Sequence, residues 1–409
     1  MDSSVKKIRR PLGIGWQLSP ATGWGVYGIN LAMALSAGRR FAPVSLVHPI
    51  GSGGGYAPQG TVLKAARAQY YEFARVSGGA AGRKVTCPFP VLHPLGNQLA
   101  RLRQTGGDNN AAKRIHLVGT PDIGVVFMEY SPPNAIAMRR AEEYTAIVTG
   151  STWNADILRR QGIANVTLVR QGIDPSLFYP LSSAPAFGDR FVVFSGGKIE
   201  YRKAQDIVVA AFRTFHARHP DALLATSWQN LYPGPLVRAM ALRGNVISAP
   251  AVKNGTLDIS SWLVNNGLPP GSFVDHGIVP NHLMAEVIRN ADVALFPNRC
   301  EGGTNLVAME CMASGVPVIL SANTGHLDLI HPDRCLSLNA QSPVTPPNSA
   351  VGVDGWGESD VDEVVEALEA VYSDRKAAKG RAAAAAEFMR DWTWERQVER
   401  LVIELDRLI

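Results

Sequence analysis

Short apolar runs alternate with longer segments of helical spacing through the first half of the chain. Such runs predict buried strands, and apolar residues three or four positions apart predict helices. The predicted strands lie at 11–18, 42–49, 123–130, 145–151 and 166–172, and the predicted helices at 23–35, 62–76, 133–144 and 152–162. This alternation favours a parallel, doubly wound sheet.

A stretch rich in Pro, Ser and Gly at 178–189 separates this series from a second one. The second series predicts strands at 190–197, 222–228, 273–279, 291–297 and 316–321, and helices at 205–219, 305–315 and 393–405. We therefore expect an α/β protein of two Rossmann-like, doubly wound domains facing a cleft, with ligands at the carboxyl ends of the strands. The predicted parts are an N-terminal domain at 1–180, a C-terminal domain at 181–385 and a helix at 386–409 that packs back on the N-terminal domain. Residues 341–359 are expected to form a long surface loop.

Composition narrows the class of protein. The 409 residues are 46% hydrophobic and 18% charged, as in soluble globular proteins. The sequence has no apolar run near the roughly 18 residues of a membrane span. The four cysteines lack both paired spacing and nearby histidines at zinc-finger spacing, so we expect a reduced, cytoplasmic protein without disulfides or structural zinc.

Charge is distributed unevenly along the chain. Between Ser3 and Gly107 there are thirteen Lys or Arg residues and a single acid, Glu72. This excess favours an anionic surface or an anionic or lipid-linked acceptor. The basic, aromatic helix at 62–76 could lie on the inner face of a membrane as a peripheral contact, or could be a packed helix with a solvated face. We expect no nucleic-acid partner.

Two motifs suggest sites that the rest of the sequence does not support. The segment GWGVYG (23–28) has the glycine pattern of a dinucleotide site, but the acid expected about 20 residues later is missing, since the next acid is Glu72. Gly23 and Gly25 would still let the backbone approach an anion. The acidic segment DVD (360–362) resembles a metal-binding pair, but its position predicts a helix start capped by Ser359.

The segment EGGTNLVAME (301–310) predicts a loop and a helix after a buried strand. With Thr304 or Asn305 as N-cap, the first amides and the positive end of the helix dipole would stabilise an anion. Glu301 would lie in the loop and Glu310 would face outward, where each could accept hydrogen bonds from sugar hydroxyls. The alternative is an ordinary capped helix with two surface acids.

A second phosphate feature lies in the segment SGGKIEYRKAQD (195–206), where a strand ends in two glycines and a helix follows. Lys198 and Lys203 could clamp a diphosphate there and neutralise the charge that grows as a leaving group departs. The alternative is a solvated basic loop. Both phosphate features lie at strand ends of one predicted sheet. Together they favour a phosphate site over either alternative.

At this point the sequence resembles the retaining GT-B glycosyltransferases of family 4. The segment VTLVRQGIDPSLFYP (166–180) is similar to a family motif, with Asp174, Phe178 and Pro180 in place. The loop GGKIEYRKAQD has Lys198 where the family usually has Arg and Lys203 where it has Lys. The stretch at 273–321 follows the family's donor site almost throughout.

The resemblance implies roles for these residues. Glu310 would bind the ribose and Glu301 the sugar hydroxyls, although eight residues separate them, one more than the family usually has. Glu129 stands where the family often has a histidine. The base is expected near Gly277 and Val279. The remaining implied donor contacts are Gly23, Gly25, Gly197, Thr304, Asn305 and Leu306.

The implied reaction is transfer of a hexose from a nucleoside-diphosphate sugar, with retention, in cell-surface polysaccharide or glycoconjugate synthesis. The nucleotide sugar is a co-substrate, and neither a cofactor nor a metal is expected, because Lys198 and Lys203 supply positive charge. Three alternatives remain open: a nucleotide-sugar epimerase of related fold, a catalytically weak sugar-nucleotide-binding protein, and a peripheral membrane scaffold.

Overall fold

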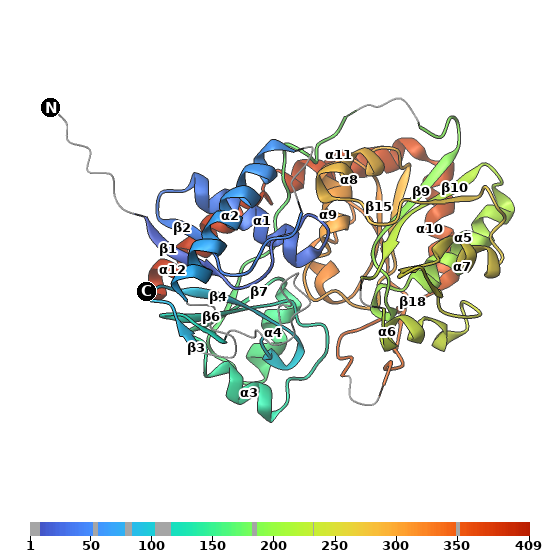
Figure 1. Cartoon of the computed structure of the whole chain (residues 1–409). Helices are drawn as coiled ribbons and strands as arrows, with labels where there is room; N and C mark the ends of the chain where they lie inside the picture. Colours follow the sequence, from blue (N-terminus) through green and yellow to red (C-terminus); the bar gives the residue numbers. More distant parts are fainter. Residues whose placement is uncertain are drawn as a thin grey trace. The chain divides into compact units, whose positions relative to one another are not determined.

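The computed structural model describes residues 9–51, 56–77, 84–102, 116–181, 186–231, 233–348 and 352–409. These residues form two compact units, shown in Figure 1. The first unit contains residues up to Met128, together with 133–172 and 394–409, and the second contains 129–132 and 173–393. The chain therefore passes into the second unit twice, once for only four residues.

The first unit is built on a six-stranded parallel sheet with the order β2-β1-β4-β6-β7-β8. Its strands are β1 (Arg10–Ile14), β2 (Phe41–Ser45), β4 (Val91–Leu95), β6 (Asp122–Val126), β7 (Ala146–Thr149) and β8 (Val166–Leu168). A separate parallel pair joins β3 (Lys84–Thr86) and β5 (His116–Val118). The helical segments are α1 (Gly23–Ala37), α2 (Ala57–Val76), η1 (Asn97–Leu99), α3 (Ala135–Ala141), α4 (Thr152–Arg160) and α12 (Trp394–Leu408).

The sequence pattern missed β4, which lies in the middle of this sheet. Its sequence, VLHPL, contains Pro94, which has no amide hydrogen to donate and is rare in a central strand. All five of its residues are nevertheless buried and pair in register with β6, from Val91 opposite Asp122 to Leu95 opposite Val126.

Two glycines of the GWGVYG segment are explained by packing within the first unit. A Cβ atom on Gly25 would lie 2.3 Å from the carbonyl oxygen of Ser19, and one on Gly28 would lie 2.6 Å from the indole nitrogen of Trp16. Thr22 caps α1 by accepting the amide hydrogen of Gly25. These close approaches account for Gly25 and Gly28 without a dinucleotide, whereas a Cβ atom on Gly23 would meet nothing within 4 Å.

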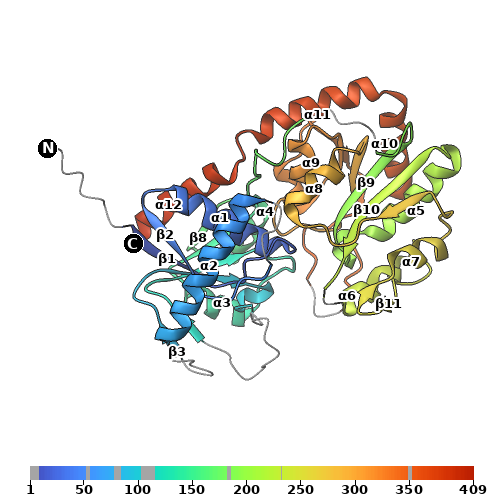
Figure 2. The same cartoon turned by 45° about the horizontal axis from the view of Figure 1, so that its top comes forward.

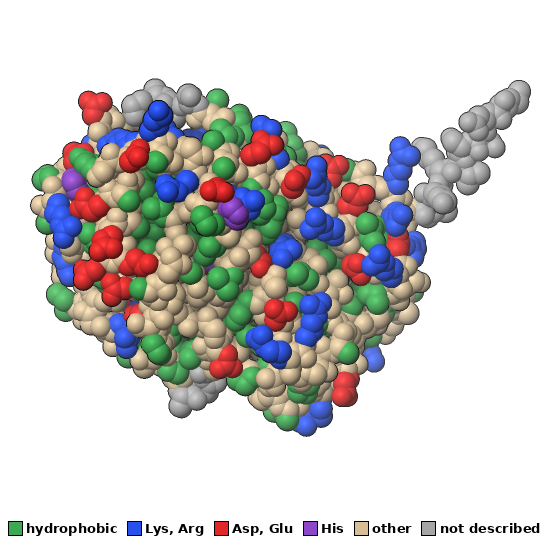
Figure 3. All heavy atoms as spheres, turned by 180° about the vertical axis from the view of Figure 1, so that it is seen from behind, with side chains coloured by type: hydrophobic (Ala, Val, Ile, Leu, Met, Phe, Trp, Pro, Cys, Tyr) green, Lys and Arg blue, Asp and Glu red, His purple; other side chains and the backbone are tan. Residues whose placement is uncertain are grey.

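Acids from elsewhere in the chain partly compensate the basic residues of the first unit. Arg10 and Arg40 both pair with Asp406 of α12, which packs against α1. Arg101 pairs with Asp122 at 2.9 Å. Acidic and basic side chains are also interspersed on the face that Figure 3 shows. Ion pairs within the first unit therefore neutralise part of the predicted positive charge.

The basic helix α2 lies beside α1 in both views (Figures 1 and 2) and buries Leu63 and Ala66. Its Gln69 accepts the amide hydrogen of Ser45 and donates to the carbonyl of Pro43, which fixes the helix to strand β2. Among the described helices, none has the length and apolarity that a membrane span needs.

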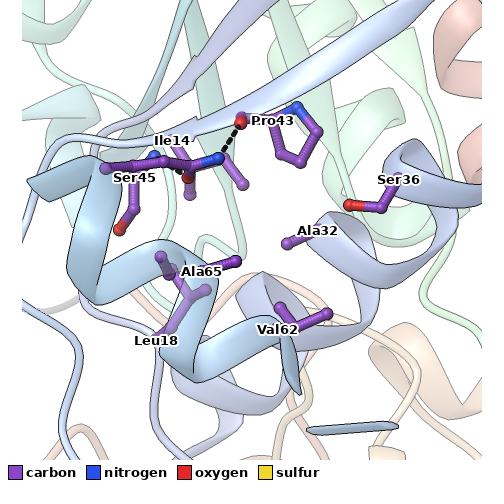
Figure 4. A pocket seen from close by; sticks show the side chains of 10 residues that line it. Ile14, Leu18, Ala32, Ser36, Pro43, Ser45, Val62 and Ala65 are labelled. Atoms are coloured by element: carbon purple, nitrogen blue, oxygen red, sulfur yellow. Dashed lines mark hydrogen bonds between the residues drawn. The ribbon is translucent and has the colours of Figure 1, made fainter. Parts of the chain in front are cut away.

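A cavity of about 30 Å³ lies between these two helices and strands β1 and β2 (Figure 4). Apolar side chains such as Ile14, Leu18 and Val62 line most of it. This space has room for a few water molecules at most, so the cavity is a packing gap and not a substrate site.

The second unit has a six-stranded parallel sheet with the order β13-β10-β9-β14-β15-β16. The strands are β9 (Phe191–Lys198), β10 (Ala222–Gln229), β13 (Phe273–Asp275), β14 (Val293–Phe296), β15 (Val318–Ser321) and β16 (Leu336–Leu338). Two antiparallel pairs join β11 (Val252–Lys253) to β12 (Thr256–Leu257) and β17 (Gln341–Ser342) to β18 (Glu358–Ser359).

Alternate residues of β9 pack on opposite faces of this sheet. Phe191 and Val193 face a core that includes α5 and α10, whereas Val192 and Phe194 face a core that includes α8, α9 and α11. Figure 2 shows these helices around the strands. The helical segments are η2 (Tyr201–Lys203), α5 (Gln205–Arg218), α6 (Pro235–Arg238), η3 (Ala239–Arg243), α7 (Ile259–Asn265), α8 (Asn281–Ile288), α9 (Leu306–Ala313), η4 (Thr324–Asp328), α10 (Val361–Ser373) and α11 (Arg375–Met389).

The stretch at 341–359 is not only a surface loop. Its ends pair as β17 and β18, and its Trp356 is 8% exposed. The Trp356 indole donates to the carbonyl of Glu129 at 2.9 Å, and the amide of Ser131 donates to the carbonyl of Gly352 at 3.1 Å. These contacts hold segment 129–132 in the second unit.

Two predictions about segment boundaries need correction. Asp360, and not Ser359, caps α10, because its side chain accepts the amide hydrogens of Asp362 and Glu363, and Ser359 belongs to β18. The second unit begins at Ile173, before the predicted linker at 178–189, because Ile173 and Phe178 are buried in its core. Residues 182–185 of that linker lie outside the described residues.

Candidate functional site

Two predicted loops begin at neighbouring strand ends: the lysine loop (198–204), with Lys198 and Lys203, and the glutamate loop (297–305), with Glu301. With its six strands numbered in chain order, the second unit has the arrangement 3-2-1-4-5-6. The order reverses between β9 and β14, and ligands of such sheets bind outside the carboxyl ends of the strands at this point. β9 leads into Lys198 and Lys203, and β14 leads into Glu301.

Lys203 and Glu301, both predicted to be catalytic, form a buried ion pair. Their side chains are 12% and 6% exposed, so Lys203 is not part of a solvated basic loop and Glu301 is not a surface acid. Burial lowers the pKa of Lys203, and Glu301 opposes that change. Burial would raise the pKa of Glu301, but Lys203 and Arg202 outweigh it and hold the pKa below its ordinary value.

The other two predicted catalytic residues join the same cluster through Glu200 and Arg202. Lys198 is half exposed and pairs with Glu200 at 3.1 Å. Glu129 pairs with Arg202 at 2.7 Å. Burial raises the pKa of Glu129, and the positive charge of Arg202 opposes that rise. The sequence prediction missed Arg202, although it lies directly before Lys203.

Helix α9 begins after the glutamate loop, and Asn305 is its N-cap, as one of the two predicted choices had it. Asn305 has a positive φ of 66°, accepts the amide hydrogen of Ala308, and contacts His326 at 3.1 Å. Thr304 is fully buried, and Leu306 is the first helical residue. The first-turn amides of α9 lack intrahelical acceptors, as at any helix start.

Glu310 does not face outward, so that prediction is wrong. The side chain is buried in the second unit and accepts a hydrogen bond from the Asn281 amide of α8 at 2.7 Å. Burial raises the pKa of Glu310 to about 8, and the hydrogen bond only partly opposes this rise. At pH 7 the carboxyl group is therefore mostly protonated.

Two of the predicted glycine contacts lie at strand ends of the second unit, and the other two lie in the first turn of helix α1. Gly197 closes β9 with a φ of 129°, and Gly277 follows β13 with a φ of 61°. Ser227 donates to the carbonyl of Gly277 at 2.8 Å, and Val279 packs against the core of the second unit. Gly23 and Gly25 belong to the first unit.

Arg299, which the sequence prediction also missed, joins three loops around the cluster. Its guanidinium is fully buried, donates to Asp206 at 2.6 and 2.8 Å, and donates to Glu358 at 2.7 and 2.9 Å. Its backbone amide donates to the carbonyl of Arg202, and its carbonyl accepts from Gly357. Arg299 thereby fixes the loop that carries Glu301.

Replacement of Gly325 by alanine is expected to distort the glutamate loop. A Cβ atom at this position would lie 1.7 Å from the carbonyl oxygen of Gly303 and 2.8 Å from that of Glu301, so backbone must move. We expect nucleoside-diphosphate affinity to fall at least ~10-fold, because displaced loop amides lose their alignment. Calorimetric titration measures this loss.

The matched control is Gly380→Ala in α11, where a Cβ atom meets nothing within 4 Å. It should keep full affinity and stabilise the helix by about 0.5–1 kcal/mol. Equal affinity of both variants would contradict the proposed tight packing of the glutamate loop.

Replacement of Glu310 by glutamine is expected to stabilise the second unit, increasingly as the pH rises. An acid whose pKa is raised by folding contributes stability that is complete below its unfolded pKa and is lost as pH rises through its folded pKa. For Glu310 the window runs from about 4.5 to about 8, and glutamine cannot ionise. At pH 7 the variant should gain on the order of 3 kcal/mol.

Thermal unfolding of wild type and Glu310→Gln between pH 4 and pH 9 tests this expectation. Glu286→Gln, in the exposed face of the neighbouring helix α8, is the control and should show no such trend. A difference in Tm that does not change with pH would show that Glu310 is not a buried acid in solution.

Residues 281–401 match the model of a family described as family 4 glycosyltransferase in conflict systems. The matched range begins at α8 and ends within α12, and it includes β14, α9, Glu301 and Glu310. Comparison of the sequence with curated proteins gave no match.

Several solved structures share the fold. Sucrose-phosphate synthase from Thermosynechococcus elongatus has 16% identity and a TM-score of 0.61, with 98% of this chain and 99% of that chain covered. HepE from Anabaena, in complex with UDP and glucose, has 13% identity and a TM-score of 0.60, with 98% and 100% covered. A glycosyltransferase from Rickettsia africae has 10% identity and a TM-score of 0.60, with 98% and 99% covered.

The solved structures confirm the predicted fold of two Rossmann-like units, as in glycosyltransferases of the GT-B fold. The family match supports the resemblance to family 4 glycosyltransferases over residues 281–401.

Proposed function

We propose that the protein is a retaining, metal-independent hexosyltransferase that uses a nucleoside-diphosphate sugar. One observation carries the proposal: Lys203 and the first amides of α9 follow neighbouring strands of one sheet. Lys203, paired with Glu301, lies in the loop after β9, and the α9 amides follow β14, which pairs with β9. Positive charge and free amides at the switch point of such a sheet suit a diphosphate.

In the proposed reaction, the bond between the anomeric carbon and the diphosphate breaks and a bond to the acceptor oxygen forms on the same face of the sugar. The acceptor's proton passes to the departing phosphate. Lys203, Lys198 and the α9 amides stabilise the charge that grows on the diphosphate. Because Lys203 is largely buried, its charge acts in a medium of low dielectric, which strengthens this effect.

The roles of the two acids follow from their surroundings. Glu301 is kept ionised by Lys203 and Arg202, so it can accept hydrogen bonds from sugar hydroxyls. Glu310, protonated at neutral pH, can donate a hydrogen bond to a ribose oxygen and accept one from a ribose hydroxyl. Glu129 is the proposed contact to the sugar where the family often has a histidine.

For the substrates, we propose a nucleoside-diphosphate hexose as donor and an anionic or lipid-linked acceptor used in cell-surface polysaccharide or glycoconjugate synthesis. HepE, a structural relative, was solved with UDP-glucose, which supports this class of donor. The basic residues of the first unit support an anionic acceptor or a peripheral membrane contact, although Arg10 and Arg40 are already paired. A cytoplasmic location is part of this proposal.

The experiment that tests the proposal is release of nucleoside diphosphate from a panel of UDP-, GDP- and ADP-hexoses in the presence of a chelator. We expect slow hydrolysis of one donor, because water can replace the acceptor. The anomeric configuration of the released sugar, measured by proton NMR at early times, should equal that of the donor. An inverted product, or turnover only with added metal, would contradict the proposed mechanism.

A further inference from the structure

Arg202 lies among three carboxylates that come from three separate segments of the second unit. Its Nη2 atom lies 2.7 Å from Glu129 and 2.8 Å from Glu200, and its Nη1 atom lies 3.3 Å from Glu301. The Nη1 atom also donates to the carbonyl of Cys300 at 3.4 Å. Since the side chain is only 10% exposed, these charges interact in a largely dry environment.

The backbone at Arg202 is fixed as firmly as its side chain. Its carbonyl oxygen accepts the amide hydrogens of Arg299 at 2.8 Å and Cys300 at 3.1 Å. Arg299 is itself held by Asp206 and Glu358. Arg202 thus joins the lysine loop to the glutamate loop both through its side chain and through its backbone carbonyl.

Segment 129–132 reaches this cluster in a fixed position. The Glu129 carbonyl accepts hydrogen bonds from the indole of Trp356 at 2.9 Å and from the thiol of Cys300 at 3.5 Å. The ring of Tyr130 stacks on Trp356 with centroids 5.8 Å apart. Arg202 therefore receives a carboxylate whose main chain is already held by the second unit.

Arg202 supplies one of the three positive charges that offset the three carboxylates of this cluster. Three cations, Lys198, Arg202 and Lys203, face three carboxylates. Without Arg202, the Oε1 atom of Glu301 would still contact Lys203, but its Oε2 atom would lose the contact with the guanidinium. Lysine at this position would retain the charge but not the planar fork that reaches several carboxylates at once.

We propose that Arg202 is a positioning residue for the transfer reaction. Its guanidinium holds the Glu301 carboxylate in place, and through that carboxylate the Lys203 ammonium, and it brings Glu129 into the same cluster. This inference rests on the proposed function. Arg202 acts through these neighbours and not on the donor itself, so its loss should reduce kcat far more than nucleotide affinity.

The test compares Arg202→Met and Arg202→Lys with wild type in kcat, KM and nucleoside-diphosphate affinity. We expect Arg202→Met to lower kcat about 100-fold, as for misplaced catalytic groups, with affinity changed less than about threefold. Arg202→Lys should recover about tenfold of that loss, because it keeps the charge. Unchanged kcat in Arg202→Met would overturn the proposal.

The pH profile separates positioning from simple structural support. Arg202 is faced by Glu200 and Lys203 from its own loop, Glu301 and Cys300 from the glutamate loop, and Glu129 and Tyr130 from segment 129–132. Loss of the cation disfavours the ionised carboxylates, so the acid limb of the Arg202→Met profile should move to higher pH. An unmoved acid limb would mean that Arg202 does not control these carboxylates.

Arg190→Met is the matched control. Its guanidinium donates to the carbonyls of Asp221, Ala222 and Gly271, at the opposite end of the same sheet. This variant should lower Tm and leave kcat and the pH profile unchanged. If Arg202→Met behaves in the same way, Arg202 is a structural residue and the proposal is overturned.

Failure of the proposed function would be visible separately, because wild type would then neither bind nor turn over any donor. The arrangement around Arg202 would still be tested by thermal unfolding of Arg202→Met, Glu129→Gln and the double variant. We expect the double variant to unfold at a higher temperature than Arg202→Met, because one of the three carboxylates around the lost guanidinium is then neutral. Additive losses in Tm would overturn the coupling.

Discussion

Replacement of Lys203 by alanine is expected to lower donor turnover by about 10³-fold, the range seen when one preorganised charge-stabilising donor is removed. The Lys203 side chain is 12% exposed and its ammonium is held by Glu301, so neither solvent nor another lysine replaces it easily. Its removal also leaves Glu301 with Arg202 as the remaining cation in contact. Steady-state release of nucleoside diphosphate measures the effect on kcat.

The control for this variant is Lys253→Ala, an exposed lysine of the same unit whose contact with Asp258 is 3.8 Å long. It should retain full turnover, because exposed pairs contribute little. If Lys203→Ala kept more than a tenth of wild-type kcat while remaining folded, the diphosphate would have to bind away from this lysine.

Replacement of Arg299 by methionine is expected to destabilise the second unit by about 3–5 kcal/mol, the cost of breaking a buried ion pair on one side. Arg299 is fully buried, and its loss leaves both Asp206 and Glu358 without their main partner. The transition of the second unit in thermal or denaturant unfolding measures this loss.

Arg243→Met is the control for Arg299, because Arg243 contacts the same carboxylate of Glu358 at 3.4 Å but is 36% exposed. Its loss should cost less than about 1 kcal/mol. Equal destabilisation by the two variants would contradict the dominant role that burial gives to Arg299.

The fold could be predicted from the sequence wherever strands are continuous apolar runs. The runs at 190–197 and 291–297 became β9 and β14, and their adjacency defines the switch point. Strand β4 was not predicted, because Pro94 interrupts its apolar pattern. Its burial comes from pairing with β1 and β6. Local pattern alone does not contain that pairing.

The site residues divide in the same way. The glutamate loop and the helix after it were predictable because Glu301, Asn305 and α9 are close in sequence. Arg202 and Arg299 were missed because their partners, Glu129 and Glu358, are distant in sequence. Spacing shows that such charges exist but does not show which of them meet.

Glu310 illustrates a third limit of local pattern. Helix α9 has apolar or small residues around most of its surface, so its sequence does not identify an exposed face. The burial of Glu310 depends on Asn281 in α8, which supplies its hydrogen bond. Only tertiary packing decides whether such an acid is buried.

The measurement that tests the central claim most directly is a crystal structure with a bound nucleoside diphosphate. The account predicts the diphosphate between Lys203 and the first amides of α9, with the ribose at Glu310. A nucleotide bound instead at Gly23–Gly28 of the first unit would contradict the assignment of the donor site to the second unit.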